Sequence, residues 1–401
     1  MTAPRHWRLS VAGPPLQKAL FAACCATALA APVTHAAVLQ ATLITVRDDP
    51  RLERTRLERG YLGHAGGPAA DGLKVALEEG RFELDSAATG VTLASADVAT
   101  LQAARAAAQA AEKSGAALLL TDLPADWTLA VADAVTLPVL NIGNPADRLR
   151  EQDCRSRLFH FLPSERMRAD ALAQTLVSRR WSKLLLLVGP GEADRARAAT
   201  ASASIKRYGL QTVAAKNFKL SADPRERELA NSLLLTAGLA YDTVWVVDGD
   251  GEFARSLPYR TTLPRPVVGD AGLAALAWHA QFERYGAPQV SRRFAKSAQR
   301  PMVATDWAAW MAGKLLVALA TALPKGPNAA WAQAIAKMPI DGSKGTTLSF
   351  RSWDGQLRQP LLLTDGQGVV SQAPVDGVLH PTEVLDTLGA DAPEKLCKVA
   401  R

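Results

Sequence analysis

Short apolar runs alternate with amphipathic segments through the first two thirds of the chain. Runs such as Leu-Leu-Leu-Leu-Val at 184–188 carry no polar alternation, which is typical of strands covered by helices on both faces. Between the runs, the Ala-rich segment 101–113 keeps a polar stripe of Gln102, Arg105 and Gln109, as expected of a helix that covers a sheet. The alternation predicts parallel α/β units rather than a sandwich or a helical bundle. Strands are predicted at 38–46, 116–120, 138–142, 183–188, 211–215, 243–247 and 266–268, and helices at 73–79, 101–113, 164–179, 192–208 and 224–237.

The pattern changes after residue 270. Helices are predicted at 273–285, 290–298 and 305–322, and from residue 346 the turn signals Trp-Asp-Gly and Thr-Asp-Gly separate β-rich runs of an antiparallel meander. This tail is too short to fold alone, so we expect it to complete one of two α/β lobes, with several chain crossovers forming a hinge and a cleft. The predicted division is 37–157 plus 268–324 for the first lobe, and 158–267 plus 325–401 for the second.

The N-terminal segment 1–36 reads as a cleavable secretion signal. Arg5, Arg8 and Lys18 precede an apolar stretch of roughly 15 residues that ends in the small-residue pattern Thr-His-Ala at 34–36. That stretch is shorter than the ~20 residues needed to cross a bilayer, so we expect a soluble exported protein without membrane insertion. Cys24 resembles a lipid-attachment position, but Phe21 stands where such sites favour a branched aliphatic residue.

Charge limits the classes of partner. Removing the three signal cations from 46 Lys+Arg leaves 43 against 39 Asp+Glu, and these cations are scattered along the predicted helices. Such a balance argues against a nucleic-acid partner. After signal removal Cys154 and Cys397 are the remaining cysteines. In an oxidising compartment they are expected to form a disulfide, which would close a loop of roughly 240 residues worth at most about 5 kcal/mol.

Several segments carry a family resemblance. They are Ala-Trp-His at 277–279, the run 282–289, Asp-Trp-Ala-Ala-Trp-Met-Ala at 306–312, the run 348–360, and Leu-Asp-Thr-Leu-Gly at 385–389. The sequence resembles type I periplasmic solute-binding proteins of the branched-chain amino acid transporter class, and within it the substrate-binding proteins of PQQ-dependent alcohol dehydrogenase systems. This resemblance implies an α/β fold of two Rossmann-like lobes with mainly parallel sheets. It also implies a monomeric periplasmic protein that captures a small solute in the cleft and docks on a membrane permease.

Ligands of open α/β sheets bind outside the carboxyl ends of the strands. The candidate residues are therefore those at or after the ends of the predicted strands. In the first lobe the glycine-rich run 61–67 precedes a helix, so its backbone could approach an anion, although a plain flexible connection explains it equally well. The first-lobe candidates are Arg47, Tyr61, His64, Thr121, Asp122, Trp127, Asn141 and Asn144. His160 lies on the expected crossover, where a hinge histidine bonded to backbone is the alternative to a cleft residue.

The second-lobe candidates are Glu192, Asp248 and Asp250, and Trp307 comes from a first-lobe helix. The acidic run 248–252 lacks the ligand spacing of an EF-hand, so helix capping by an aspartate is preferred to a metal site. An indole from Trp307, or from Trp127 on the loop after a strand, could stack on a flat ligand, with Arg47 pairing a carboxylate. No resident cofactor is expected. The ligand hypotheses are PQQ itself, an alcohol, aldehyde or acid of the same pathway, and an amino acid.

An enzyme is the rival class. The four histidines that remain after signal removal, His64, His160, His279 and His380, form no metalloprotease motif, and neither a nucleophile elbow nor a phosphate-binding glycine loop is present in the sequence. We therefore expect no enzyme activity. A ligand-sensing partner of a membrane receptor remains an alternative, because the same cleft could signal instead of deliver.

Overall fold

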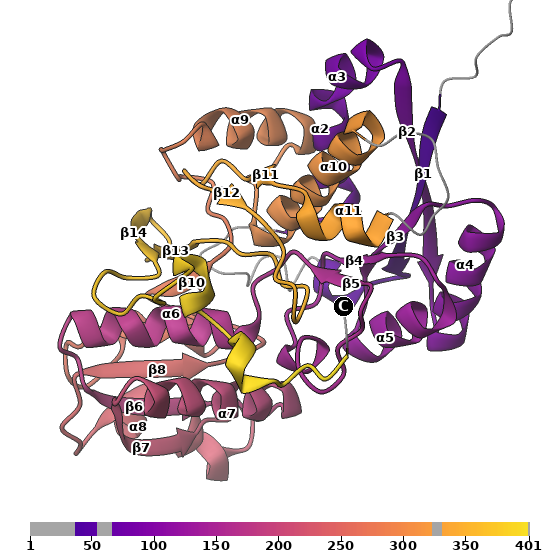
Figure 1. Cartoon of the computed structure of the whole chain (residues 1–401). Coiled ribbons are helices and arrows are strands. Elements are labelled where there is room, and N and C mark those ends of the chain that lie inside the picture. Colours follow the sequence, from indigo (N-terminus) through magenta and orange to yellow (C-terminus); the bar gives the residue numbers. More distant parts are fainter. Residues whose placement is uncertain (1–36, 54–65, 323–330, 400–401) are drawn as a thin grey trace, which may run out of the picture. The chain divides into compact units, whose positions relative to one another are not determined.

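The computed structural model describes residues 37–53, 66–322 and 331–399. The segment 1–36, and with it the predicted signal, lies outside the described residues, as do Tyr61 and His64. Two parallel sheets organise the described chain (Figure 1). We call the elements packed around the five-stranded sheet the first lobe, and those around the four-stranded sheet the second lobe; both belong to one compact unit, Ala36–Arg401.

The first sheet has the strand order β2-β1-β3-β4-β5, and every pairing in it is parallel. The strands are β1 (Ala37–Val46), β2 (Thr89–Val98), β3 (Leu118–Asp122), β4 (Val139–Asn141) and β5 (Leu158–His160). Its helices are α2 (Ala70–Glu79), α3 (Arg81–Ser86), α4 (Leu101–Lys113), α5 (Ala125–Ala134), α9 (Ala287–Ala298), α10 (Ala304–Ala322) and α11 (Trp331–Lys337). A polar cap starts α4, where the Thr100 hydroxyl accepts from the Ala103 amide.

The second sheet has the order β7-β6-β8-β9, again parallel throughout. Its strands are β6 (Lys183–Val188), β7 (Gln211–Asn217), β8 (Thr243–Val247) and β9 (Val267–Gly269), with helices α6 (Glu165–Ser178), α7 (Glu192–Arg207) and α8 (Ser232–Thr236). A third, antiparallel sheet packs with α6 (Figure 1). It consists of β10 (Ala274–Leu276), β13 (Leu361–Thr364) and β14 (Val369–Ala373), the last two from the tail of the chain. A hairpin of β11 (Ile340–Asp341) and β12 (Thr347–Leu348) packs with the first lobe.

The remaining helical turns are 3₁₀ helices. They are η1 (Pro50–Leu52), η3 (Asp147–Leu149), η4 (Pro224–Ala230), η5 (Ala254–Tyr259), η7 (Val384–Thr387) and η8 (Ala392–Glu394). Two of them, η3 and η8, help to line the large cavity described below.

The hydrophobic cores show where the chain crosses between lobes. Phe161 belongs to the first core and Met167 to the second, and the chain returns between Ala275 and Ala277. A third crossing separates Leu357 in the first core from Leu361 in the second. The prediction of two parallel α/β sheets joined by several crossovers is confirmed.

Three local predictions were wrong. Residues 273–285 do not form a helix, because Ala274–Leu276 pairs as β10 with β13, about 90 residues later in the chain, and this pairing overrides local helix propensity. The predicted helix 224–237 is split, since the Asn231 side chain accepts from the amides of Leu233 and Leu234 and starts α8 afresh. Trp127 is not in a loop but on α5. The edge strand β2 was not predicted at all.

The cysteine pair behaves as expected. Cys154, which follows η3, is bonded to Cys397 near the end of the chain, with their Cα atoms 5.6 Å apart. The bond spans 243 residues of sequence and ties the tail to the first lobe's η3 region.

Candidate functional site

The carboxyl ends of β1, β3 and β4 bring a charged cluster together. Arg51 donates to Asp49 Oδ2 at 2.5 Å and to Asp122 Oδ1 at 2.7 Å. Burial alone would lower the pKa of Arg51, but the hydrogen bonds and charges of Asp49 and Asp122 outweigh it and raise that pKa. Gly143 packs directly on Asp122, since a Cβ at this glycine would lie 1.7 Å from Oδ1. The predicted residue Asp122 therefore sits in an ion-paired cluster at the expected sheet edge.

A second cluster joins three more predicted residues behind that edge. Asn141 Nδ2 donates to the carbonyl of Asn144 at 2.8 Å and lies 2.9 Å from Nδ1 of His160. In return the Asn144 amide donates to Asn141 Oδ1 at 2.9 Å. Asn141 and His160 are fully buried, so they fix the loop after β4 against the first crossover. Thr121 is equally buried, and its hydroxyl has no hydrogen-bond partner within the described ranges.

In the second lobe, aspartates hold the loops after β6 and β8. Asp194 accepts from the amides of Gly191 and Gly249, at 3.2 and 2.7 Å. Asp248 accepts from the Ala254 amide at 2.8 Å and so holds the loop after β8 against the start of η5, whose N-cap position is Phe253 and has no side-chain cap. Burial raises the pKa of Asp248, and its bonds to backbone amides oppose the change. The predicted residues Glu192 and Asp250 are exposed. No group of three or more His, Cys, Asp or Glu side chains suited to a metal ion occurs in the described part of the chain.

A cavity of about 1110 Å³ lies between the two lobes and is open to solvent. The first lobe contributes the η3 segment, and the second lobe contributes the start of α6 and one face of α7, with η8 closing one side. Small side chains on α7 leave the space open: Ala196, Ala199 and Ala203 recur along the helix and point into it. Among the predicted residues, Asn144 lines this cavity.

Asp147 connects the lobes at the cavity wall. Its carboxylate accepts from the Arg166 amide at 2.9 Å and from the Thr200 hydroxyl at 3.1 Å, so one η3 side chain is bonded to both α6 and α7. Burial raises the pKa of Asp147, and the nearby charge of Glu165 adds to this shift while the bonds from Arg166 and Ser164 oppose it. Glu151 on the same wall also has a raised pKa, first through burial and then through the charge of Asp147.

The cavity wall carries charges of both signs, and its arginines are paired. Arg166 binds Glu394 at 2.8 Å and approaches Glu151 at 3.9 Å. Arg197 binds Asp270 and lies 3.6 Å from Glu165. Because each cation has an acidic neighbour, the wall offers paired donors and acceptors rather than a single-sign field.

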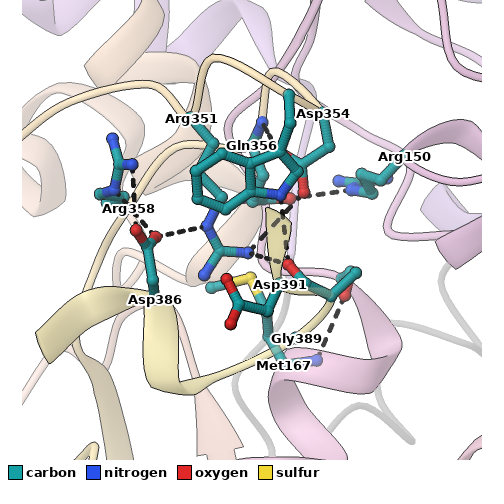
Figure 2. Close-up of polar contacts among 12 residues, drawn as sticks. Arg150, Met167, Arg351, Asp354, Gln356, Arg358, Asp386, Gly389 and Asp391 are labelled. Carbon is teal, nitrogen blue, oxygen red and sulfur yellow. Dashed lines mark hydrogen bonds and ion pairs between the residues drawn. The ribbon is translucent and has the colours of Figure 1, made fainter. Parts of the chain in front are cut away.

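The junction beside the cavity is held by buried arginines (Figure 2). Arg150 is 2% exposed and donates to Gln356 Oε1 at 2.8 Å and to the Leu162 carbonyl at 2.9 Å. Gln356 Nε2 donates to the same Leu162 carbonyl at 3.0 Å. Burial lowers the pKa of Arg150 to about 10. These bonds connect the η3 segment with the first and third crossovers.

Arg351 holds the tail at the same junction (Figure 2). Its Nε donates to Asp386 Oδ1 at 2.8 Å, and its Nη2 donates to the Leu388 carbonyl at 2.7 Å. Arg358 binds the same carboxylate through both oxygens, at 2.8 and 3.0 Å. Asp386 is therefore shared by two guanidinium groups, of which Arg351 is the fully buried one.

A buried lysine lies where the third crossover begins. Lys344 is 2% exposed; its Nζ donates to Gln359 Oε1 at 2.9 Å and to the Pro360 carbonyl at 3.1 Å, and it lies 3.7 Å from the centre of the Trp307 ring. No carboxylate pairs with it in the described residues. Burial lowers its pKa well below the usual value. Gln359 in turn donates to the Phe161 carbonyl at 2.7 Å, so the amine supports two crossovers.

Other predicted residues lie elsewhere. Arg47 is exposed and donates to the Asp97 carbonyl at the end of β2. Trp127 is half-buried against the core beneath α4 and α5. Trp307 is fully buried; it stacks on Trp278 and donates to the Gly342 carbonyl at 3.1 Å. The proposed pairing of Arg47 with an indole is not formed in the structure.

Sequence reasoning missed the cavity wall itself. The wall residues Asp147 and Arg166 were not among the candidates, nor were the α7 residues Arg197 and Thr200, nor Arg150 at the junction beside the wall. A signal was present, because the run Asp-Arg-Leu-Arg at 147–150 directly follows the loop of a predicted strand, where polar side chains reach a sheet edge. The α7 face carries no such signal, since an Ala-rich amphipathic helix looks the same whether it faces solvent or a cavity.

Over the described ranges, no helix is both long and apolar enough to cross a membrane. No protein-family model matches the chain, and no curated protein is significantly similar to it in sequence.

Solved structures do resemble it. A periplasmic binding protein from Burkholderia mallei is 13% identical, with a TM-score of 0.66 over 91% of this chain and 99% of that one. A leucine-, isoleucine-, valine-, threonine- and alanine-binding protein from Brucella ovis, in a closed conformation, is 14% identical, with a TM-score of 0.64 over 82% and 89%. An ABC transporter solute-binding protein from R. palustris in complex with benzoate is 13% identical, with a TM-score of 0.60 over 81% and 92%. The chain thus has the fold of type I periplasmic binding proteins.

Proposed function

We propose that the protein is the substrate-binding component of an ABC transporter, which captures a small solute between its lobes and releases it unchanged to a membrane permease. The observation that carries the proposal is the cavity of about 1110 Å³ whose walls come from both lobes. Ligand sites favour such positions between lobes, and this volume lies slightly above the usual range of roughly 300–1,000 Å³. The solute-binding proteins of the same fold support it.

The proposal places the protein in the periplasm as a monomer, exported by the N-terminal signal and without a resident cofactor. The basis for the location is the sequence pattern of residues 1–36 together with the fold.

The wall's paired charges favour a polar solute that can both accept and donate hydrogen bonds. Arg166 and Glu394, or Arg197 and Glu165, could each exchange part of their mutual contact for a ligand group. The sequence resemblance supports a narrower proposal, a solute of PQQ-dependent alcohol oxidation: an alcohol, aldehyde or acid of that pathway, or PQQ itself. An amino acid is the competing ligand, in keeping with the Brucella ovis protein.

A thermal-shift screen of the purified protein tests this function. The panel contains PQQ, short alcohols, aldehydes, carboxylates and branched-chain amino acids. A ligand present at 100 times its Kd should stabilise the fold by about 2.7 kcal/mol. Turnover of a panel compound, with no shift from any of them, would contradict a binding protein.

Two α7 variants locate the site. Ala203→Trp places a large side chain in the cavity and should abolish the shift. Ser202→Trp adds the same side chain at an exposed neighbouring position that does not line the cavity, and should keep it. Equal shifts in both variants would place the ligand elsewhere.

A further inference from the structure

The end of the chain runs from the second lobe to the first beside the large cavity. Its second-lobe end is Gly389, which follows Leu388 of the second core. The Gly389 amide donates to Asp170 Oδ2 at 2.9 Å, and Arg207 donates to that oxygen at 2.8 Å and to the Gly389 carbonyl at 3.0 Å. Because Asp170 belongs to α6 and Arg207 to α7, this end is fixed to two helices of the second lobe.

The other end is fixed to the first lobe. Cys397 is bonded to Cys154, which lies in the connection between β4 and β5 of the first sheet. Cys154 is buried, and the next residue, Arg155, binds Asp133 on α5 at 2.6 Å. We call residues 389–397 the strap. It adds a fourth link between the lobes to the three chain crossovers, and this link is closed by a covalent bond.

The middle of the strap passes along the large cavity and is held less firmly than its ends. Asp391 and Glu394, on either end of η8, line that cavity. Glu394 accepts from the Asp391 amide at 2.9 Å and from Arg166 at 2.8 Å, in an ion pair whose side chains are both partly exposed. Water can replace contacts of this kind at low cost. The middle can therefore unwind while both ends stay attached.

We propose that the strap limits how far the two lobes can separate at the large cavity. The eight peptide units from Gly389 to Cys397 reach at most about 29 Å when fully extended, and winding into η8 takes up part of that length. Opening of the lobes draws out the length stored in η8, after which the disulfide stops it. The limit is a property of lobe movement, so it does not depend on which solute the cavity takes.

Distance measurements between the lobes test the strap. Spin labels are attached through p-acetylphenylalanine at Lys113 on α4 and at Ser202 on α7, two exposed positions, so that no cysteine is added. Double electron–electron resonance on the wild-type protein should give a distance distribution with a sharp upper limit. Cys154→Ser combined with Cys397→Ser should extend the distribution to longer distances that the wild type never reaches.

A lengthened strap separates the reach of the link from its effect on stability. An insert of about ten Gly and Ser residues after Lys395 keeps the disulfide but adds reach, and it should give the same long distances as the double serine variant. Glu394→Gln weakens the pair with Arg166 without changing the strap's length, so it should keep the wild-type upper limit.

Three results would each overturn the proposal. The first is a wild-type distance distribution in the double serine variant. The second is a wild-type upper limit in the protein with the insert, which would show that the length of the strap sets nothing. The third is a thiol titration that finds Cys154 and Cys397 free in the wild-type protein.

Discussion

The junction in Figure 2 and the wall of the large cavity use the same residue types in opposite ways. At the junction, Arg150 and Arg351 are at most 2% exposed and donate to several backbone carbonyls as well as to side chains. At the cavity wall, the side chains of Arg166 and Arg207 are 20% and 34% exposed and pair mainly with carboxylates.

The difference indicates which part is fixed and which can adapt. A buried guanidinium surrounded by carbonyls has no alternative partners, so breaking one contact leaves a charge without compensation. Partly exposed pairs are worth about 0–1 kcal/mol, because water can replace either partner. The junction therefore sets how the crossovers are held, while the cavity wall can rearrange around a ligand at low cost.

Removing Arg351 should have the largest effect on stability. Arg351→Ala deletes the bonds to Asp386 and to the carbonyls of Leu385 and Leu388, all within the core. We expect the free energy of unfolding to fall by about 3–5 kcal/mol, measured by urea denaturation of the full chain.

Arg358→Ala is the matched control for that variant. It removes the second partner of Asp386, but Arg358 is 17% exposed and Arg351 remains to hold the carboxylate. Its free energy of unfolding should therefore fall clearly less than that of Arg351→Ala. If the two variants were equally destabilised, burial would not be what distinguishes the junction from the cavity wall.

Lys344 extends the comparison to a buried amine that has no carboxylate partner in the described residues. Because burial lowers the pKa of Lys344 in the folded state, the folded chain releases this proton at a lower pH than the unfolded chain does. For this group alone, stability rises with pH until the unfolded lysine also deprotonates near 10.5. In Lys344→Met this contribution disappears, so the pH slope of unfolding free energy should decrease by up to about 1.4 kcal/mol per pH unit.

The control for Lys344 is Lys314→Met. Lys314 also lies over an indole, that of Trp310 at 4.8 Å, but its side chain is 30% exposed. Denaturation series at pH 7, 8 and 9 compare the two. A slope unchanged in Lys344→Met, or reduced equally in both variants, would contradict a depressed pKa at residue 344.

The sheets could be predicted because their strands are continuous apolar runs. Residues 184–188 and 243–247 are buried on both sheet faces, and burial of that kind leaves a mark in local sequence. The edge strand β2 was not predicted because its burial is irregular and four of its ten residues are exposed. The strand β10 could not be recognised locally, since it depends on pairing with β13 from the tail.

Of the candidate site, only the residues at the ends of predicted strands could be predicted from the sequence. Asp122 and Asn141 end strands, Asn144 follows one, and all three gather at one sheet edge, as parallel topology requires. The bond from Arg150 to Gln356 joins residues 206 apart in sequence, so no local pattern indicates it. The burial of Lys344 has no local sequence signal either, because a run such as Gly-Ser-Lys-Gly at 342–345 normally indicates an exposed turn.

A substitution of Asp147 should have the smallest effect on the free energy of unfolding, and it tests whether the cavity wall is adaptable. Asp147→Asn keeps an oxygen that can accept from the Arg166 amide and the Thr200 hydroxyl. At pH 7 its unfolding free energy should stay within about 1 kcal/mol of the wild type. Burial raises the pKa of Asp147, so the folded wild type binds a proton more readily than the unfolded chain, whose carboxyl titrates near 3.8. This contribution to wild-type stability therefore grows as pH falls through the raised pKa, and the wild type should gain on the variant between pH 7 and 4. Asp365→Asn, on the exposed turn between β13 and β14, supplies the baseline. A wild-type advantage that shrinks on acidification would show that Asp147 is stabilised as a carboxylate, and the cavity wall would then resemble the junction.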